Sequence, residues 1–376
     1  MRINIDATTL LLPSAGIKTY MHYWLGSLAE AASHRGDNIG VYPPTLQPSS
    51  VIEHGSQRNS AGDFLRLKFV QLANTRHSPL VDFLSSGVDL FHCSQHIRRP
   101  PRGPAVTATI FDFSCWTKPE YHTADNVAAT KRYADQILRK CDGLIAISSH
   151  ARDDAAEILG ISKDRIRVIY PGIADAFFEV SQEQASGIRS KYELPATYLL
   201  FVGCIEPRKN ILGLIRAYRC LPENIRREAP LILAGPFGWK SEEVRNHIGT
   251  RDVRYLDYVP EPDLPGLFRG AAALVYPSFY EGFGLPVAQA MAAGVPVITS
   301  DRSSLPEVAG DGALTVDPDS TDALAAAMER ILTNPEVGRT LGKKGRERAQ
   351  LFRWPACAED SLDYFHEVRE RIGRRG

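Results

Sequence analysis

Two short segments of the sequence combine charged side chains with glycine in a way that suits the binding of an anion. In FVGCIEPRKN, residues 201–210, an apolar run ends at Gly203, and Arg208 and Lys209 follow just before an expected helix whose N-cap is Asn210. Arginine binds a diphosphate through paired hydrogen bonds, and lysine adds a compact positive charge. We interpret the pair as a diphosphate clamp at the end of a strand; the alternative is ordinary solvated surface charge.

The second segment, EGFGLP at 281–286, places a carboxylate beside a glycine-rich turn. Pro286 suits the first turn of a helix, and glycines let backbone amides approach a ligand closely. The helix N-terminus adds about half a positive charge at the same place. Because a carboxylate would repel a phosphate there, we expect Glu281 to accept hydrogen bonds from sugar hydroxyls. The simpler alternative is a glycine turn in which Glu281 is a cap.

Both segments lie in a chain that alternates short apolar strands with amphipathic helices. The expected strands are 2–5, 88–92, 106–110, 143–147, 166–169, 198–202, 231–234, 253–256, 273–276 and 295–299, and the expected helices are 17–32, 127–141, 211–221, 264–270, 286–293 and 321–332. Such alternation predicts parallel sheets covered by helices on both faces, which bind ligands at the carboxyl ends of their strands. We interpret the turn at Pro171-Gly172 and the polar stretch 179–190 as a linker between two such domains.

The composition is that of an ordinary folded protein. The 376 residues hold 44 Lys and Arg against 44 Asp and Glu, so no net charge is left to hold nucleic acid as a partner. The six cysteines are far apart and include no Cys-x-x-Cys pair, which argues against a zinc knuckle and a disulfide framework. The sequence shows no signal peptide and no apolar run of about eighteen residues, so we expect a cytoplasmic protein.

The first half of the chain contains a basic cluster that could contact a membrane surface. Arg98, Arg99 and Arg102 stand among prolines. We interpret the cluster as a solvated loop; the alternative is contact with an anionic lipid carrier or peripheral contact with the inner face of a membrane.

The motifs together resemble glycosyltransferase family 4, a retaining family with the GT-B fold. The second half carries FVGCIEPRKN, LILAGPFGW, RYLDYVPEPDLPGLF, YPSFYEGFGLPVAQAMAAGVPVITSDRSSLPEV and FRW, and the first half carries SAGIKTY, FHCSQH, TIFDFSCWTKPEYH, GLIAISSHARDD and VIYPGI, which are similar to mannosyltransferase-like members. The resemblance implies an α/β protein with two Rossmann-like domains whose parallel sheets face a central cleft. An N-terminal acceptor-binding domain would comprise 1–178 and a C-terminal nucleotide-sugar-binding domain 179–355, and a helix at 356–376 would cross back to the first domain.

The resemblance also implies a reaction and its residues. A hexose, with mannose favoured, would pass from a GDP-sugar or UDP-sugar to a hydroxyl of a glycan, lipid-linked or small-molecule acceptor, with the anomeric configuration kept and without a metal or other cofactor. Arg208 and Lys209 match the family's diphosphate clamp, and Glu281 matches the first glutamate of its E-x7-E motif, which holds donor-sugar hydroxyls. These three are the expected catalytic residues. The expected donor-binding positions are Gly16, Gly203, Gly235, Gly282, Phe283, Gly284, Leu285 and Gln289.

Two positions depart from the family pattern. Gln289 stands where the family has the second glutamate of that motif, so its bond to the nucleotide ribose would be neutral and weaker. Phe111-Asp112 replaces a histidine and aspartate pair; Asp112, His92 and His96 are candidates for the missing polar group, each with a structural role as its alternative. These departures leave open a second function, a sugar-nucleotide-binding protein on the same fold with little or no activity.

Two further segments contain residues typical of ligand motifs. The Asp-x-Asp at 317–319 follows a strand in a proline turn, and we interpret it as part of a loop rather than as a metal site. A dinucleotide fingerprint at Gly282-x-Gly284 fails because its third small residue would be Val287 and because Pro286 interrupts the helix entry.

Overall fold

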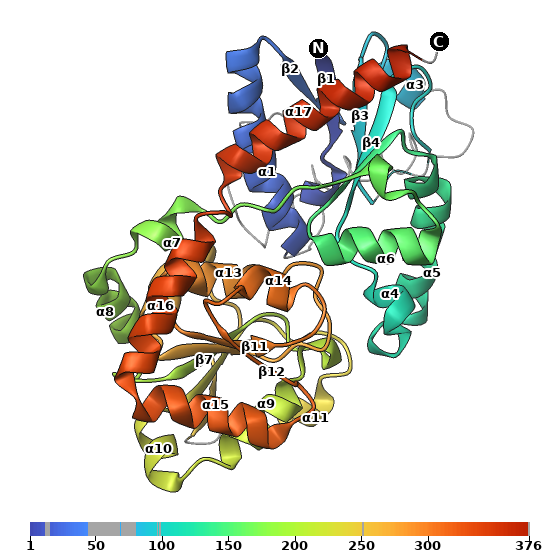
Figure 1. Cartoon of the computed structure of the whole chain (residues 1–376). Helices are drawn as coiled ribbons and strands as arrows, with labels where there is room; N and C mark the ends of the chain where they lie inside the picture. Colours follow the sequence, from blue (N-terminus) through green and yellow to red (C-terminus); the bar gives the residue numbers. More distant parts are fainter. Residues whose placement is uncertain are drawn as a thin grey trace. The chain divides into compact units, whose positions relative to one another are not determined.

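The computed structural model describes residues 1–11, 16–43, 68, 80–95, 97, 99–249 and 252–374. The chain forms two compact units (Figure 1). The first unit consists of Met1–Gly172 and Phe352–Gly376, and the second of Ile173–Leu351. Among the described residues, each unit contains one six-stranded sheet in which all neighbouring strands pair in parallel. The predicted α/β class with two parallel sheets is therefore confirmed.

The sheet of the first unit has the strand order β2-β1-β3-β4-β5-β6. Its strands are β1 (Arg2–Asp6), β2 (Asn38–Tyr42), β3 (Leu90–Cys93), β4 (Ala105–Ile110), β5 (Gly143–Ala146) and β6 (Ile166–Val168). Its helices are α1 (Gly16–Arg35), α3 (Leu80–Leu84), α4 (Ser114–Thr117), α5 (Ala124–Gln136), α6 (Ser149–Leu159) and α17 (Trp354–Gly373).

The sheet of the second unit has the order β12-β11-β10-β7-β8-β9. Its strands are β7 (Leu199–Val202), β8 (Leu231–Ala234), β9 (Val253–Tyr255), β10 (Ala273–Tyr276), β11 (Val297–Ser300) and β12 (Leu314–Val316). Its helices are α7 (Asp175–Glu179), α8 (Gln182–Lys191), α9 (Ile211–Arg219), α10 (Glu223–Glu228), α11 (Glu242–Arg245), α12 (Leu264–Arg269), α13 (Leu285–Ala292), α14 (Leu305–Ala309), α15 (Thr321–Thr333) and α16 (Pro335–Ala349).

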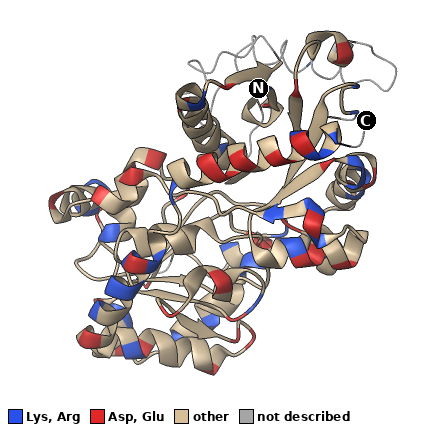
Figure 2. Ribbon diagram, turned by 45° about the horizontal axis from the view of Figure 1, so that its top comes forward, with Lys and Arg blue, Asp and Glu red and all other residues tan. Residues whose placement is uncertain are grey.

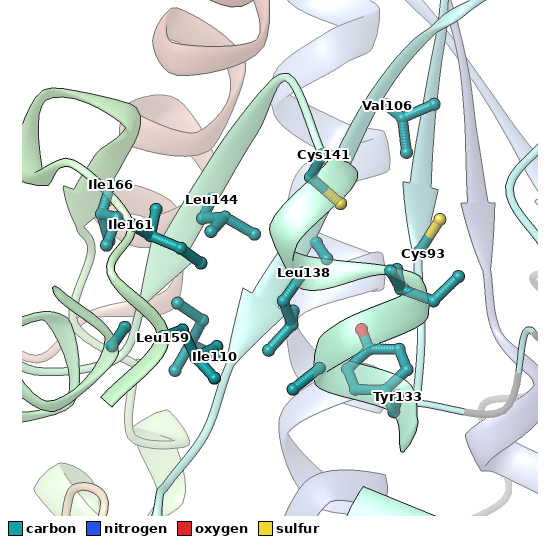
Figure 3. Close-up of a cluster of buried hydrophobic side chains, with 14 of the residues drawn as sticks. Cys93, Val106, Ile110, Tyr133, Leu138, Cys141, Leu144, Leu159, Ile161 and Ile166 are labelled. Atoms are coloured by element: carbon teal, nitrogen blue, oxygen red, sulfur yellow. The ribbon is translucent and has the colours of Figure 1, made fainter. Parts of the chain in front are cut away.

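Most of the inner strands are buried along their whole length, as expected of parallel strands covered on both faces. Every residue of β4, β5, β8 and β10 is buried. In the first unit, Cys93 of β3, Val106 of β4, Tyr133 of α5 and Leu144 of β5 pack in one cluster (Figure 3). This core packs α5 against the sheet and so holds the strands from which the loops of the first unit extend.

The last helix, α17, completes the first unit although it follows the second unit in the sequence. It packs against α1, where Trp24 Nε1 donates a hydrogen bond of 3.0 Å to Ser361 Oγ. Tyr364 reaches the sheet, because its hydroxyl donates to the Arg165 carbonyl at 2.7 Å and accepts from Leu144 N at 3.1 Å. The first unit is thus built from two distant segments of the chain.

The interpretation of 179–190 as a linker is wrong. Residues Gln182–Lys191 form helix α8, which packs against α12 inside the second unit. The helix begins with a capping box, in which Ser181 Oγ accepts from Gln184 N and Gln184 Oε1 accepts from Ser181 N. The sequence prediction depended on apolar periodicity, which this mostly polar helix lacks, and only its Ala185 is buried.

Charges of both signs are distributed over the helices of both units, as Figure 2 shows. Within the described part of the chain, no helix has both the length and the apolar character needed to cross a membrane.

Candidate active site

The three expected catalytic residues lie in two loops at the carboxyl edge of the second sheet, the edge at which its parallel strands end. Arg208 and Lys209 belong to a 3₁₀ turn, Pro207–Lys209, between β7 and α9, and Glu281 lies between β10 and α13. Because β7 and β10 are neighbours, the two loops leave the sheet side by side. A backbone hydrogen bond of 2.9 Å from Phe279 N to Arg208 O joins them.

The side chains of these residues converge in one buried cluster. Lys209 Nζ donates to Glu281 Oε1 at 2.5 Å, and Arg208 Nη1 donates to Glu281 Oε2 at 2.9 Å. Arg208 Nη2 donates to Glu206 Oε1 at 2.7 Å, and Lys209 Nζ donates to the Tyr276 hydroxyl at 2.6 Å. The exposed fractions of the Arg208, Lys209 and Glu281 side chains are 13%, 10% and 8%.

The electrostatics of the cluster keep Glu281 ionised. Burial alone would raise the pKa of Glu281, but the charges of Arg208 and Lys209 outweigh it and lower this pKa to about 2. Burial, assisted by Arg208, lowers the pKa of Lys209, while Glu281 and Glu206 oppose that change. Two carboxylates and two cations therefore share a site that water scarcely reaches.

Sequence reasoning missed several residues that hold this cluster in place. Glu206 and Tyr276 contact the two cations directly. The backbone of Glu281 is held by the loop after β11, because Glu281 N donates to Ser303 Oγ and Ser304 Oγ donates to Glu281 O, both at 2.9 Å. Glu206 shares a segment with Arg208, which was a usable signal; nothing in the sequence singled out Ser303 or Ser304.

The expected donor-binding glycines lie at the same edge, at the ends of β7 and β8 and before α13. Gly235 has φ of +133°, and a Cβ there would lie 2.2 Å from the Gly203 carbonyl oxygen. Gly284 is the N-cap of α13 with φ of +97°, and a Cβ there would lie 2.6 Å from Leu305 Cδ2. Both positions therefore require glycine, and they leave backbone rather than side chains facing the edge.

The other expected donor-binding residues are distributed over both units. Gly282 and Phe283 are buried, Leu285 and Gln289 are half-buried, and Gln289 lies on α13. Gly16 begins α1 in the first unit.

The Asp-x-Asp at 317–319 is engaged by an arginine. Arg302 Nη2 lies 2.7 Å from Asp317 Oδ1 and 2.7 Å from Asp319 Oδ2. Nearby, Asn210 is the N-cap residue of α9, as predicted, but it adopts the left-handed conformation and its side chain makes no capping bond. Its Nδ2 donates instead to Pro318 O at 2.7 Å. Over the described ranges, no three His, Cys, Asp or Glu side chains gather as metal ligands would.

In the first unit, Phe111 packs with its ring edge-on against Tyr20, with 5.2 Å between ring centroids. His92 is buried, and its ring nitrogens lie 2.9 and 3.0 Å from the hydroxyls of Thr107 and Thr109, which supports a structural role. Asp112 Oδ1 accepts from the backbone and hydroxyl of Ser114 at the start of α4.

The remaining candidates of the first unit concern its basic cluster. Arg99 pairs with Asp82 at 2.6 Å, and Asp82 also accepts from Arg102 N. His96 and Arg98 lie outside the described residues.

Comparison with known proteins identifies the family. A model described as Glycosyltransferase Family 4 matches residues 24–177, and one described as Glycosyl transferases group 1 matches residues 187–348. O-antigen chain mannosyltransferase B of Escherichia coli is 36% identical over 271 residues, which cover 71% of this chain and 71% of that protein. The chain belongs to glycosyltransferase family 4. This glycosyltransferase is also 29% identical over 238 residues to the serotype-specific mannosyltransferase WbdA of Escherichia coli, which covers 61% of the chain and 29% of WbdA.

The fold of the glycosyltransferase matches solved structures. The crystal structure of Anabaena HepE in complex with UDP-glucose has a TM-score of 0.69 and 18% identity, and the match covers 98% of this chain and 100% of that one. This match confirms the predicted GT-B fold. The family models and the mannosyltransferase relative confirm the predicted family, and the protein is a hexosyltransferase.

Proposed function

We propose that this glycosyltransferase transfers a hexose, with mannose favoured, from a nucleotide diphosphate sugar to an acceptor hydroxyl with retention of the anomeric configuration. The observation that supports the donor site is the convergence of Arg208 and Lys209 on the Glu281 carboxylate at the carboxyl edge of the second sheet. Open parallel sheets bind their ligands at this edge.

Stabilisation of the leaving group is the step to which these residues are suited. As the glycosidic bond breaks, its electron pair stays with the diphosphate oxygen, and negative charge grows there. Preorganised cations such as Arg208 and Lys209 stabilise that charge more strongly in a buried site than in water. The N-terminus of α13, with Gly284 as its N-cap, adds backbone N–H groups at the same edge.

Glu281 is suited to a second task, orientation of the donor sugar. Each of its oxygens accepts one hydrogen bond from a cation. A carboxylate oxygen has room for a further acceptance, so the same side chain can receive a sugar hydroxyl. The carboxylate would then align the sugar with the two cations that receive its diphosphate.

The charge on the diphosphate is met by side chains, so we propose that transfer requires no bound metal. Arg208 and Lys209 supply two positive charges where the diphosphate would lie. Asp317 and Asp319, the carboxylates that a metal could have used, already pair with Arg302.

For the donor and the acceptor we propose chemical classes rather than single compounds. Support for mannose comes from the Escherichia coli relative named O-antigen chain mannosyltransferase B, with which 71% of this chain aligns. We propose a GDP-sugar or UDP-sugar as donor and a glycan, lipid-linked or small-molecule hydroxyl as acceptor, held by the first unit on the cytoplasmic side. Any peripheral membrane contact would use the region of Arg99 and Arg102, where Asp82 already reduces the positive charge.

One observation favours a weaker alternative, a sugar-nucleotide-binding protein without turnover. Phe111 stands where the family has a histidine, and its ring packs on Tyr20 and has no hydrogen-bonding group to offer a sugar. Retention of the complete cluster of Arg208, Lys209 and Glu281 favours the active enzyme, because a site without turnover has no need of a leaving-group clamp.

A donor panel tests the proposal. Purified protein is incubated with GDP-mannose, other GDP-sugars and UDP-sugars, with and without hydroxyl acceptors, and the released nucleoside diphosphate and the anomeric configuration of the product are measured. We expect acceptor-dependent release of GDP from GDP-mannose. Tight binding without turnover on any acceptor would establish the alternative, and neither binding nor turnover would refute both.

A further inference from the structure

A second buried carboxylate, Glu206, contacts the same arginine that Glu281 contacts. Its side chain is 4% exposed, and its Oε1 accepts from Arg208 Nη2 at 2.7 Å. Burying an ionised carboxylate is costly, and the cost is offset only where pairing geometry is good. A turn between a strand and a helix does not require a buried carboxylate, so Glu206 must have a role other than closing the loop between β7 and α9.

The local backbone does not depend on the Glu206 side chain. Glu206 precedes the 3₁₀ turn Pro207–Lys209 in an extended conformation, and its side chain makes no capping hydrogen bond. Backbone groups close the turn, with Lys209 N donating to Glu206 O at 3.0 Å. The residue before it, Ile205, is fixed by a bridge to Phe237. The carboxylate therefore serves the guanidinium and not the turn.

Arg208 is held from two sides by different nitrogens of its guanidinium. Nη2 contacts Glu206, and Nη1 contacts Glu281 Oε2 at 2.9 Å and the Tyr280 carbonyl at 2.6 Å. Because the guanidinium is a planar fork, bonds to both nitrogens fix its plane as well as its position. Without Glu206, both nitrogens would be drawn to Glu281, whose other oxygen already binds Lys209.

We propose that Glu206 is a positioning residue for the diphosphate clamp, holding Arg208 in the orientation in which its guanidinium meets the donor diphosphate. Glu206 acts through Arg208 and does not touch the donor. It also balances the cluster, in which Glu206 and Glu281 offset Arg208 and Lys209 before the donor binds. The inference rests on the proposed function, because the clamp has a use only where a nucleotide diphosphate binds.

A double-mutant cycle tests whether Glu206 acts through Arg208. The variants Glu206→Ala, Arg208→Ala and their combination are compared for kcat and KM with the donor that the wild type uses, and for the Kd of the matching nucleoside diphosphate by calorimetry. We expect Glu206→Ala to lower kcat about 10–100-fold. We expect the double variant to equal Arg208→Ala within about twofold, because a positioning residue has nothing to position once its arginine is gone.

Two further variants separate this role from a merely structural one. Glu206→Gln keeps an acceptor oxygen for Arg208, so we expect it to lose only about threefold in kcat. Glu243→Ala is the matched control, because it removes a glutamate that pairs with Arg216 at 3.6 Å but is 62% exposed; its kcat should equal that of the wild type. Thermal unfolding shows which variants are folded at the assay temperature. If Glu206→Ala is not folded at that temperature, the cycle is run with Glu206→Gln. Its loss of kcat should likewise disappear when it is combined with Arg208→Ala.

Two results would overturn the inference while leaving the proposed function intact. One is a full kcat in folded Glu206→Ala beside an impaired Arg208→Ala, and the other is additive losses in the double variant. A wild-type protein that neither binds a nucleoside diphosphate nor consumes a sugar nucleotide would refute the proposed function, and the inference with it.

Discussion

The second unit buries four charged side chains in one cluster, whereas most protein interiors bury few charged groups. Glu206, Arg208, Lys209 and Glu281 each contact an opposite charge, and each has a side chain at most 13% exposed. Breaking such a buried pair from one side leaves the remaining charge uncompensated. The residues of this cluster therefore depend on one another, and a substitution at one is felt at the others.

The charge of Glu281 is the first test of that dependence. Glu281→Gln keeps the shape of the side chain, and we expect kcat to fall about a hundredfold because the sugar and the two cations lose their common anchor. Nucleoside diphosphate binding should remain measurable by calorimetry, because Arg208 and Lys209 are retained. Glu336→Gln makes the same change in an exposed pair with Arg339 and should alter neither quantity. A wild-type kcat in Glu281→Gln would remove this residue from the site.

The lowered pKa of Glu281 also predicts a pH dependence of stability. A group whose pKa falls on folding, here from 4.5 to about 2, stabilises the protein above its unfolded pKa and loses that contribution as the pH drops toward the folded value. The contribution is about 3 kcal/mol at neutral pH. Denaturant unfolding of wild type and Glu281→Gln between pH 7 and pH 2 should show a gap in unfolding free energy that narrows below about pH 5. A gap of constant size would show that the carboxylate gains nothing from its cations.

At the scale of elements, loops after four different strands are tied together at the carboxyl edge of the second sheet. Ser303 and Ser304, after β11, hold the backbone of Glu281, after β10. Asn210, after β7, binds the carbonyl of Pro318, after β12. A site assembled in this way has its geometry set by the order of the strands.

Because the site depends on the order of the strands, the sequence predicted some of its parts and not others. Apolar runs predicted the inner strands, and the rule that ligands bind at the ends of parallel strands predicted that Arg208 and Lys209 lie close to Glu281. The edge strand β2 was not predicted, because only Val41 and Tyr42 of its five residues are buried and the segment therefore carries no clear apolar run. The roles of Ser303 and Ser304 could not be predicted, since their bonds to Glu281 depend on the fold and not on a local pattern.

The close approach of the β7 and β8 ends gives a prediction about one glycine. In Gly235→Ala, the new Cβ would meet the Gly203 carbonyl oxygen at 2.2 Å on a backbone with φ of +133°. We expect the variant to be destabilised by at least about 2 kcal/mol. Gly187→Ala on α8 is the control: its Cβ would meet nothing within 4 Å, so it should be neutral or stabilising in the same thermal unfolding assay. Equal melting temperatures for the two variants would contradict the predicted close approach.

The pairing of Arg302 with the loop at 317–319 leads to a prediction about metals. Transfer should persist, within about twofold, after dialysis against a chelator, because protein cations meet the diphosphate charge. Donor turnover before and after dialysis measures this. Activity that is lost on dialysis and restored by Mg²⁺ or Mn²⁺ would show that a metal takes part.

On the scale of the whole molecule, the first unit depends on a helix encoded at the far end of the chain. A chain ending at Leu351 lacks α17 and exposes the face of α1 around Trp24, which is fully buried in the intact unit. Each large side chain uncovered forfeits about 1.5–3 kcal/mol. We expect calorimetry to show a transition of the first unit lowered by about 10 °C or more, with that of the second unit unchanged. A chain ending at Gly373, with α17 complete, should match the full-length protein; an unchanged first transition in the shorter chain would contradict the prediction.

The same discontinuity has a consequence for biosynthesis. The second unit occupies one uninterrupted stretch, Ile173–Leu351, and all of it has been translated before Phe352 is added. The first unit begins to be synthesised earlier, but it waits for its final helix until the whole second unit has been made. Ribosomes that stall near residue 351 would therefore release chains whose later half is folded and whose earlier half presents apolar surface to chaperones and proteases.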